Sequence, residues 1–94
     1  MLTNLTTSTF DDAIKTGSVL VLWGAEWHAP SQALANRLQK MALKVKMFGV
    51  DIDHEFDLTT RFSIRGIPTL MVFTDGQLVA RDAMFTPAIQ ALIC

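Results

Sequence analysis

The sequence predicts an α/β fold in which helices cover both faces of a central mixed β-sheet. Segments with the three- to four-residue hydrophobic period of helices alternate with short apolar runs typical of strands. The pair Asp75-Gly76 favours a tight hairpin late in the chain, which adds antiparallel strands to an otherwise parallel sheet. Half of the 94 residues are hydrophobic, so we expect residues 1–94 to form a single domain with a buried core.

The first elements are a short strand, a helix and a buried strand. Leu2 and Leu5 fit the short strand. Ser8–Asp11 has the Ser-x-x-acid pattern of a helix start, and Gly17 marks the stop. Val19–Trp23 is a continuous run rich in Val and Leu, which suits a strand that is buried on both faces.

A second helix and another strand follow. Pro30 suits the first turn of the helix, where its missing N–H costs nothing. The helical period then carries Leu34, Leu38, Met41 and Ala42. Residues 45–50 have the pattern of the next strand, and a strand–helix–strand unit of this size joins parallel strands by a right-handed crossover.

The remaining elements are a helix, a hairpin and a short last helix. Asp53 is positioned to cap the third helix. Thr69–Phe73 is strongly β-forming, and Leu78–Ala80 returns antiparallel to it after the turn. Thr86 and Pro87 open the last helix, because a cap residue precedes a proline at the first helical position.

The composition argues against membrane and nucleic-acid partners. The longest unbroken apolar run is the five residues Val19–Trp23, whereas a membrane-spanning helix needs about 20. The net charge is −1 and the basic residues are scattered, so we expect no direct contact with DNA or RNA. The first residues lack the basic and apolar regions of a secretory signal, and we therefore expect a cytoplasmic location.

The few cysteine and histidine residues of the sequence argue against disulfides and metal sites. The only cysteine, Cys94, cannot form an internal disulfide or a cysteine-rich metal site. The remaining candidate ligands lack the spacing of a zinc or calcium site. They are His28, His54, Asp51, Asp53 and Glu55. We therefore expect no metal and no cofactor, and we interpret the acidic stretch at 51–55 as a helix cap and a solvated first turn.

Three segments resemble thioredoxin in the order and spacing of that family. The first, Val19–Ser31, keeps a hydrophobic strand followed by Ala25-Glu26-Trp27. The second, Ile64–Leu70, is similar to the stretch around the family's cis-proline, and the third, Phe73–Leu78, is like the family's hairpin. The resemblance covers most of the chain and implies the thioredoxin fold, with a cis bond before the proline of the second segment.

The resemblance fails at the residues that carry the family's chemistry. His28-Ala29-Pro30-Ser31 stands where the family has Cys-Gly-Pro-Cys, so His28 takes the place of the nucleophilic cysteine and Ser31 that of the resolving one. Leu22 replaces the family's buried acid, and Gly49 falls where the lysine that partners this acid often stands. Imidazole cannot form a mixed disulfide and a hydroxyl cannot resolve one, so we expect no enzyme activity at this motif.

The residues that would border the family's partner-binding groove favour a redox-inactive protein-binding module. They are Trp27, Pro30, Ile67, Pro68 and Met84. In the family this groove docks an extended segment of a partner protein beside the cis-proline, which is a strand-addition mode of recognition. We therefore expect the partner to be a protein or an extended peptide segment. Trp27 and Met84 suit binding anchors, although a tryptophan at a helix start can instead close the core.

Three alternatives stay open. The first is an atypical thiol–disulfide oxidoreductase that acts through Cys94, although nothing predicts a lowered thiol pKa at the C-terminal end of a helix. The second is a structural or oligomerising subunit, including a homo-oligomer, because the short last helix could leave apolar residues in an interface. The third is a hydrolytic role for His28 and Ser31, which could hydrogen-bond across the first helical turn.

Overall fold

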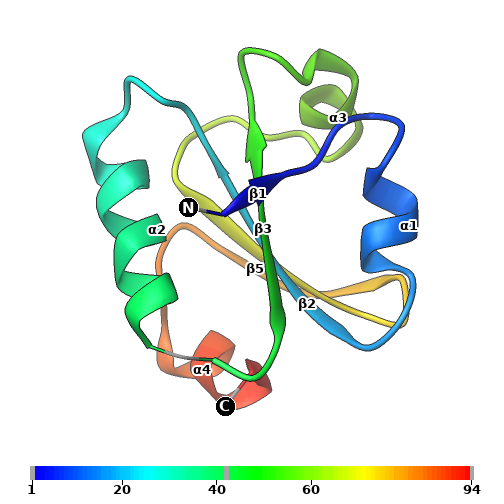
Figure 1. Cartoon of the computed structure of the whole chain (residues 1–94), viewed down its shortest axis with the longest axis vertical. Coiled ribbons are helices and arrows are strands. Elements are labelled where there is room, and N and C mark those ends of the chain that lie inside the picture. The colour runs from blue at the N-terminus through cyan, green and yellow to red at the C-terminus, as the bar shows by residue number, and fades with distance from the viewer. Residues whose placement is uncertain (1, 42, 94) are drawn as a thin grey trace.

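A computed structural model describes residues 2–41 and 43–93 and places them in a five-stranded sheet with helices on both faces (Figure 1). The elements are β1 (Thr3–Asn4), α1 (Phe10–Ile14), β2 (Ser18–Gly24), α2 (Ala29–Lys40), β3 (Lys46–Asp51), α3 (Phe56–Arg61), β4 (Thr69–Thr74), β5 (Gln77–Asp82) and α4 (Pro87–Ile93). Ala42 and Cys94, which both enter the sequence predictions, lie outside the described residues.

The sheet is mixed, as the sequence predicts, with strand order β1-β3-β2-β4-β5. The strands β1, β3 and β2 are parallel, whereas β4 runs antiparallel to β2, and β5 antiparallel to β4. Asp75 and Gly76 join β4 to β5 with φ angles of 49° and 87°. Two positive φ values are what the favoured two-residue hairpin turn requires, which confirms the predicted hairpin.

Successive residues of the central strand β2 face two separate cores. Val21 and Trp23 pack in a cluster with Phe10 of α1 and with α3. Leu22, on the other face, belongs to a cluster with Leu38 of α2 and with α4. This burial on both faces explains the unbroken apolar run of β2, and it confirms the predicted arrangement of helices on both faces of the sheet.

Two of the predicted helix caps are wrong, because the Ser8 hydroxyl meets that of Thr6 and the Asp53 carboxylate accepts from Trp27 instead. The N-cap residue of α1 is Thr9 rather than Ser8, and its hydroxyl accepts the backbone N–H of Thr6 at 2.9 Å. The N-cap residue of α3 is Glu55 rather than Asp53. The cap predicted for α4 is confirmed, since the Thr86 hydroxyl accepts the Ile89 N–H at 3.3 Å.

The longest described helix, α2, has 12 residues and follows β2 after the connecting residues 25–28. None of the helices in the ranges 2–41 and 43–93 combines the length and the apolar character needed to cross a membrane.

Candidate functional site

The start of α2 packs directly on the end of the central strand. Helix α2 begins at Ala29, so Pro30 lies within its first turn, as predicted. A Cβ atom built on Gly24, the last residue of β2, would lie 2.7 Å from the Cβ of Ser31. The missing side chain at Gly24 is therefore what lets the first turn of α2 approach the strand so closely.

His28 and Ser31 form the cap of this helix. The backbone N–H of Ser31 donates to His28 Nδ1 at 3.3 Å, and the Ser31 Oγ lies 2.7 Å from the same nitrogen. Because Nδ1 accepts the backbone N–H, the hydroxyl is the donor to it and the neutral ring carries its proton on Nε2. The predicted hydrogen bond across the first turn is confirmed. Ser31 is only 2% exposed, and among the described residues no group hydrogen-bonds to His28 Nε2 to orient the ring as a base, so this geometry does not support a hydrolytic role.

Trp27 lies on the surface and does not close the core. Its side chain is 68% exposed, and the buried tryptophan of this region is Trp23. The Trp27 indole N–H donates to the Asp53 carboxylate at 2.6 Å, and the indole meets the His28 ring edge-on, with 5.5 Å between centroids. The sequence does not indicate the contact with Asp53, because that residue fits a helix cap equally well.

The cis peptide bond of the chain lies beside this helix start. The Ile67–Pro68 bond is cis, as the resemblance implies. Thr69, the first residue of β4, pairs with Trp23 of β2, so Pro68 comes next to the end of β2. The Thr69 hydroxyl donates to the Gly66 carbonyl at 2.7 Å and holds the turn. Ile67 and Pro68 are both half-buried.

The strand β5 leads to the same end of the sheet. Asp82 pairs with Leu70, and Met84 follows two residues later with 63% of its surface exposed. The five residues of the predicted groove therefore adjoin strand or helix ends at one end of the sheet. They are Trp27, Pro30, Ile67, Pro68 and Met84.

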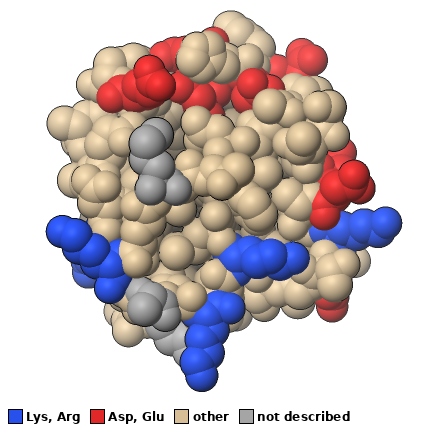
Figure 2. Space-filling model, in the orientation of Figure 1, with Lys and Arg blue, Asp and Glu red and all other residues tan. Residues whose placement is uncertain are grey.

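Acidic side chains gather at this end on the face shown in Figure 2, whereas Lys and Arg lie in its lower half. The acidic residues between the end of β2 and the first turn of α3 are Glu26, Asp51, Asp53, Glu55 and Asp57. Asp51 is 7% exposed. One of its carboxylate oxygens accepts the Asp53 N–H at 2.8 Å, and the other lies 3.3 Å from His54 Nδ1.

An exposed ion pair ties α1 to α3 away from this end. Arg61 donates to both carboxylate oxygens of Asp11, at 2.9 and 3.1 Å. This hydrogen bonding lowers the pKa of Asp11 below its ordinary 3.8 and raises the pKa of Arg61. Because both groups are in contact with water, the pair adds little to stability.

The helix that precedes Cys94 lies at the opposite end of α2. Ile89 and Ile93 of α4 share a buried cluster with Leu38, in the last turns of α2. Figure 1 shows α4 beside this end of α2, far from the loop that opens the helix. A helix of 12 residues is about 18 Å long. The residue before the only thiol is therefore remote from His28 and Ser31.

Comparison with known proteins gives consistent matches. The sequence model of the family Thioredoxin matches residues 1–91. The thioredoxin of Pseudomonas aeruginosa is 39% identical over 83 residues, which cover 82% of this chain and 77% of that protein. The thioredoxin of Staphylococcus saprophyticus is 34% identical over 87 residues, which cover 88% of this chain and 84% of that protein.

Solved structures agree in fold. A mutant thioredoxin from Halobacterium salinarum superposes with a TM-score of 0.84 and 25% identity, over 97% of this chain and 86% of that one. The oxidised form of mitochondrial thioredoxin 3 from Saccharomyces cerevisiae has a TM-score of 0.81 at 23% identity, over 97% and 91% of the two chains.

These relatives correct the functional prediction made from the motif alone. That prediction was a redox-inactive binding module without enzyme activity, and it rests on a few substituted positions. The similarity extends over more than four-fifths of the chain, to proteins that carry the name thioredoxin. The prediction is therefore wrong, and the alternative of a thiol–disulfide oxidoreductase agrees better with these relatives.

Proposed function

Since the chain belongs to the thioredoxin family, we propose that it carries out thiol–disulfide exchange in the cytoplasm, with Cys94 as its reacting thiol. The observation that carries the proposal is the similarity to proteins named thioredoxin over 82% and 88% of the chain. Cys94 is assigned because it is the only cysteine of the sequence. Positions 28 and 31 hold His and Ser, so the reaction has to proceed through one protein thiol rather than two.

The reaction that one thiol can perform is a two-step exchange. In the first step the Cys94 thiolate attacks one sulfur of a substrate disulfide, the substrate S–S bond breaks, and the second substrate sulfur leaves as a thiolate that takes up a proton. This step leaves a mixed disulfide between Cys94 and the substrate. In the second step the thiolate of a small-molecule thiol of the glutathione class attacks the substrate sulfur of that mixed disulfide. A disulfide forms between the substrate and the small molecule, the bond to Cys94 breaks, and Cys94 leaves as a thiolate.

The partner that we propose is a protein with an extended segment, bound at the end of the sheet near Pro68. Exposed Trp27 and Met84 support this assignment, because large apolar side chains in contact with water are typical of binding surfaces. About 18 Å of α2 separate this end from α4. A segment bound there would need about six further extended residues to reach α4, the helix that precedes Cys94 in the sequence.

Mass spectrometry of the intact protein after incubation with glutathione disulfide tests this proposal. We expect the mass to rise by one glutathionyl group, and we expect dithiothreitol to reverse the gain. The matched control is Cys94→Ser, which differs by one atom and should show no gain. A positive control, His28→Cys with Ser31→Cys, returns two thiols to the start of α2.

The outcome that contradicts the proposal is clear. If the wild-type mass stays unchanged while the double-cysteine variant reacts under the same conditions, then Cys94 is not a reacting thiol and one-thiol exchange is wrong.

A further inference from the structure

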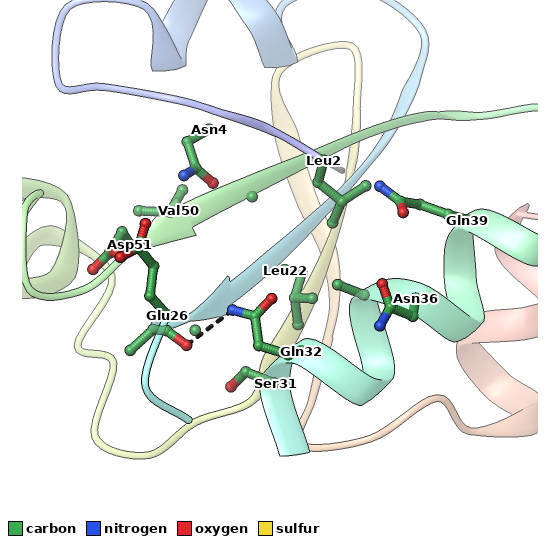
Figure 3. Close-up of a pocket in the computed structure, with 14 residues that line it drawn as sticks. Leu2, Asn4, Leu22, Glu26, Ser31, Gln32, Asn36, Gln39, Val50 and Asp51 are labelled. Atoms are coloured by element: carbon green, nitrogen blue, oxygen red, sulfur yellow. Dashed lines mark hydrogen bonds between the residues drawn. The ribbon is translucent and has the colours of Figure 1, made fainter. Parts of the chain in front are cut away.

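A pocket of about 250 Å³ lies between α2 and the sheet, behind the helix cap (Figure 3). Its floor is formed by β2 and β3, on the face that α2 covers, and one wall comes from β1. No thiol lines the pocket among the residues that the structure describes. A function for it would therefore be additional to the proposed thiol exchange.

The pocket exists because two adjacent strands lack side chains where α2 crosses them. Leu22 of β2 pairs with Gly49 of β3, and Gly24 pairs with Asp51. A Cβ atom on Gly49 would come within 2.7 Å of the Asn4 Oδ1, so only a glycine leaves this space free with Asn4 in its present position. Ligand sites of open α/β sheets lie by preference at the carboxyl ends of the parallel strands, which is where these two glycines leave space.

The side chains that line the pocket change from acidic at one end, through apolar in the middle, to carboxamides at the other end. In Figure 3 Glu26 and Asp51 lie together at one end, Leu2 and Leu22 lie in the middle, and the carboxamides of Asn36 and Gln39 lie at the other end. No lysine, arginine or histidine lines the pocket within the described residues.

The acidic end has acceptor capacity to spare. Each ionised carboxylate offers about four acceptor positions. Asp51, although nearly buried, uses one oxygen for the Asp53 N–H and has the other 3.3 Å from His54. Glu26 is exposed at the pocket mouth. Two neighbouring carboxylates repel each other, so a bound cation between them would be stabilised by both.

We propose that this pocket binds a short aliphatic primary ammonium ion, such as an alkylamine or a linear diamine. The ammonium group has three donors, which match the carboxylate oxygens of Glu26 and Asp51. The hydrocarbon chain covers Leu2 and Leu22, and a second nitrogen, where the ligand has one, donates to the carboxamide oxygens at the far end.

Size and ligand number set this ion apart from other cations. The volume is below the range of about 300–1,000 Å³ that is typical of drug-sized ligands. At about 30 Å³ for each water-sized group, it takes about eight non-hydrogen atoms. Residues 2–41 and 43–93 contain no group of three His, Cys, Asp or Glu that could hold a metal ion. Ca²⁺ and Mg²⁺ prefer six or more oxygen ligands, which two carboxylates do not supply.

Titration of the full chain with n-butylammonium, followed by amide NMR, tests the proposal. We expect saturable shifts of the Gly24 and Gly49 amides, which lie on the pocket floor. The neutral isostere n-butanol and the inorganic ions K⁺ and Mg²⁺ should leave these amides unshifted. The proposal is overturned if n-butanol shifts them equally, if Mg²⁺ competes with the amine, or if the amine causes no saturable shift up to about 10 mM, where binding free energy is marginal.

Two variants of equal net charge separate the pocket from general attraction to an acidic surface. Glu26→Gln removes one carboxylate of the pocket, and we expect binding to weaken about tenfold. Asp57→Asn removes an exposed carboxylate of α3 outside the pocket, and we expect a change within about twofold. Equal weakening by both variants, or no weakening by Glu26→Gln, would show that the amine does not bind between Glu26 and Asp51.

Discussion

Replacing Gly24 with alanine should lower the free energy of unfolding by about 1–3 kcal/mol, which is the usual cost of forcing an extra methyl group into a packed interior. The new Cβ would lie 2.7 Å from the Ser31 Cβ and 2.9 Å from its Oγ. The Ser31 Cβ is bonded directly to the backbone of the first turn of α2, so rotation of a flexible side chain cannot relieve the strain. A chain of 94 residues has a total stability of roughly 5–14 kcal/mol, so the loss is readily measured.

Urea unfolding followed by circular dichroism measures the effect as a change in midpoint at constant slope. Gly66→Ala is the matched control, because nothing lies within 4 Å of a Cβ built there, and it should change stability by less than about 0.5 kcal/mol. Adding Ser31→Gly to Gly24→Ala removes the clashing atoms. The free energy of unfolding of the double variant should therefore be about 1 kcal/mol higher than the sum of the two single changes predicts. The reasoning is refuted if Gly24→Ala is as stable as wild type, or if the two changes simply add.

Three further predictions concern the helix cap and its surroundings. His28→Ala should lower the free energy of unfolding by about 1–3 kcal/mol, because the helix loses its cap and the buried Ser31 hydroxyl loses its partner. Thermal unfolding of both proteins at pH 8 measures this loss. Trp27→Ala should change the free energy of unfolding, measured with urea, by less than about 0.5 kcal/mol, since the side chain is largely exposed, and a larger loss would mean that the indole is structural. Asp11→Asn should be less stable than wild type at neutral pH. The folded-state pKa of Asp11 is depressed, so its contribution is present above the ordinary 3.8 and is lost as the pH falls through the lower folded value. The unfolding curves of the two proteins should therefore converge as the pH falls below 3.8 and through the lower folded-state pKa of Asp11.

The strands and the hairpin could be predicted from the sequence because several local signals agree there. Val19–Trp23 is a continuous apolar run and Thr69–Phe73 is strongly β-forming, and the structure pairs them at the centre of the sheet. The helix caps of α1 and α3 could not be predicted reliably. Ser8 and Asp53 match cap patterns, but their polar side chains also suit local turns or more distant partners, and only the folded chain decides between these.

Within the site, only the contacts between residues that are close in the sequence could be predicted. The hydrogen bond between His28 and Ser31 follows from their spacing on one helical turn. The contact of Trp27 with Asp53 joins residues 26 positions apart, and the pocket combines residues of β1, β2, β3 and α2. Gln32, Asn36 and Gln39 do recur on one face of α2 at helical spacing, which is a signal for a polar wall, but the sequence does not show what that wall faces.

The functional prediction failed for a different reason. The prediction of no redox activity depended on the four residues 28–31, because the missing cysteines there remove the two-thiol reaction. The comparisons weigh the whole chain, and they connect it to proteins named thioredoxin. One-thiol exchange through Cys94 is consistent with both observations.

The central claim is tested most directly by the rate at which the protein reduces the disulfides of insulin in the presence of glutathione. The account predicts that wild type accelerates the reaction above the rate with glutathione alone, and that Cys94→Ser abolishes the acceleration. Equal rates for wild type, Cys94→Ser and glutathione alone would contradict thiol–disulfide exchange by this chain.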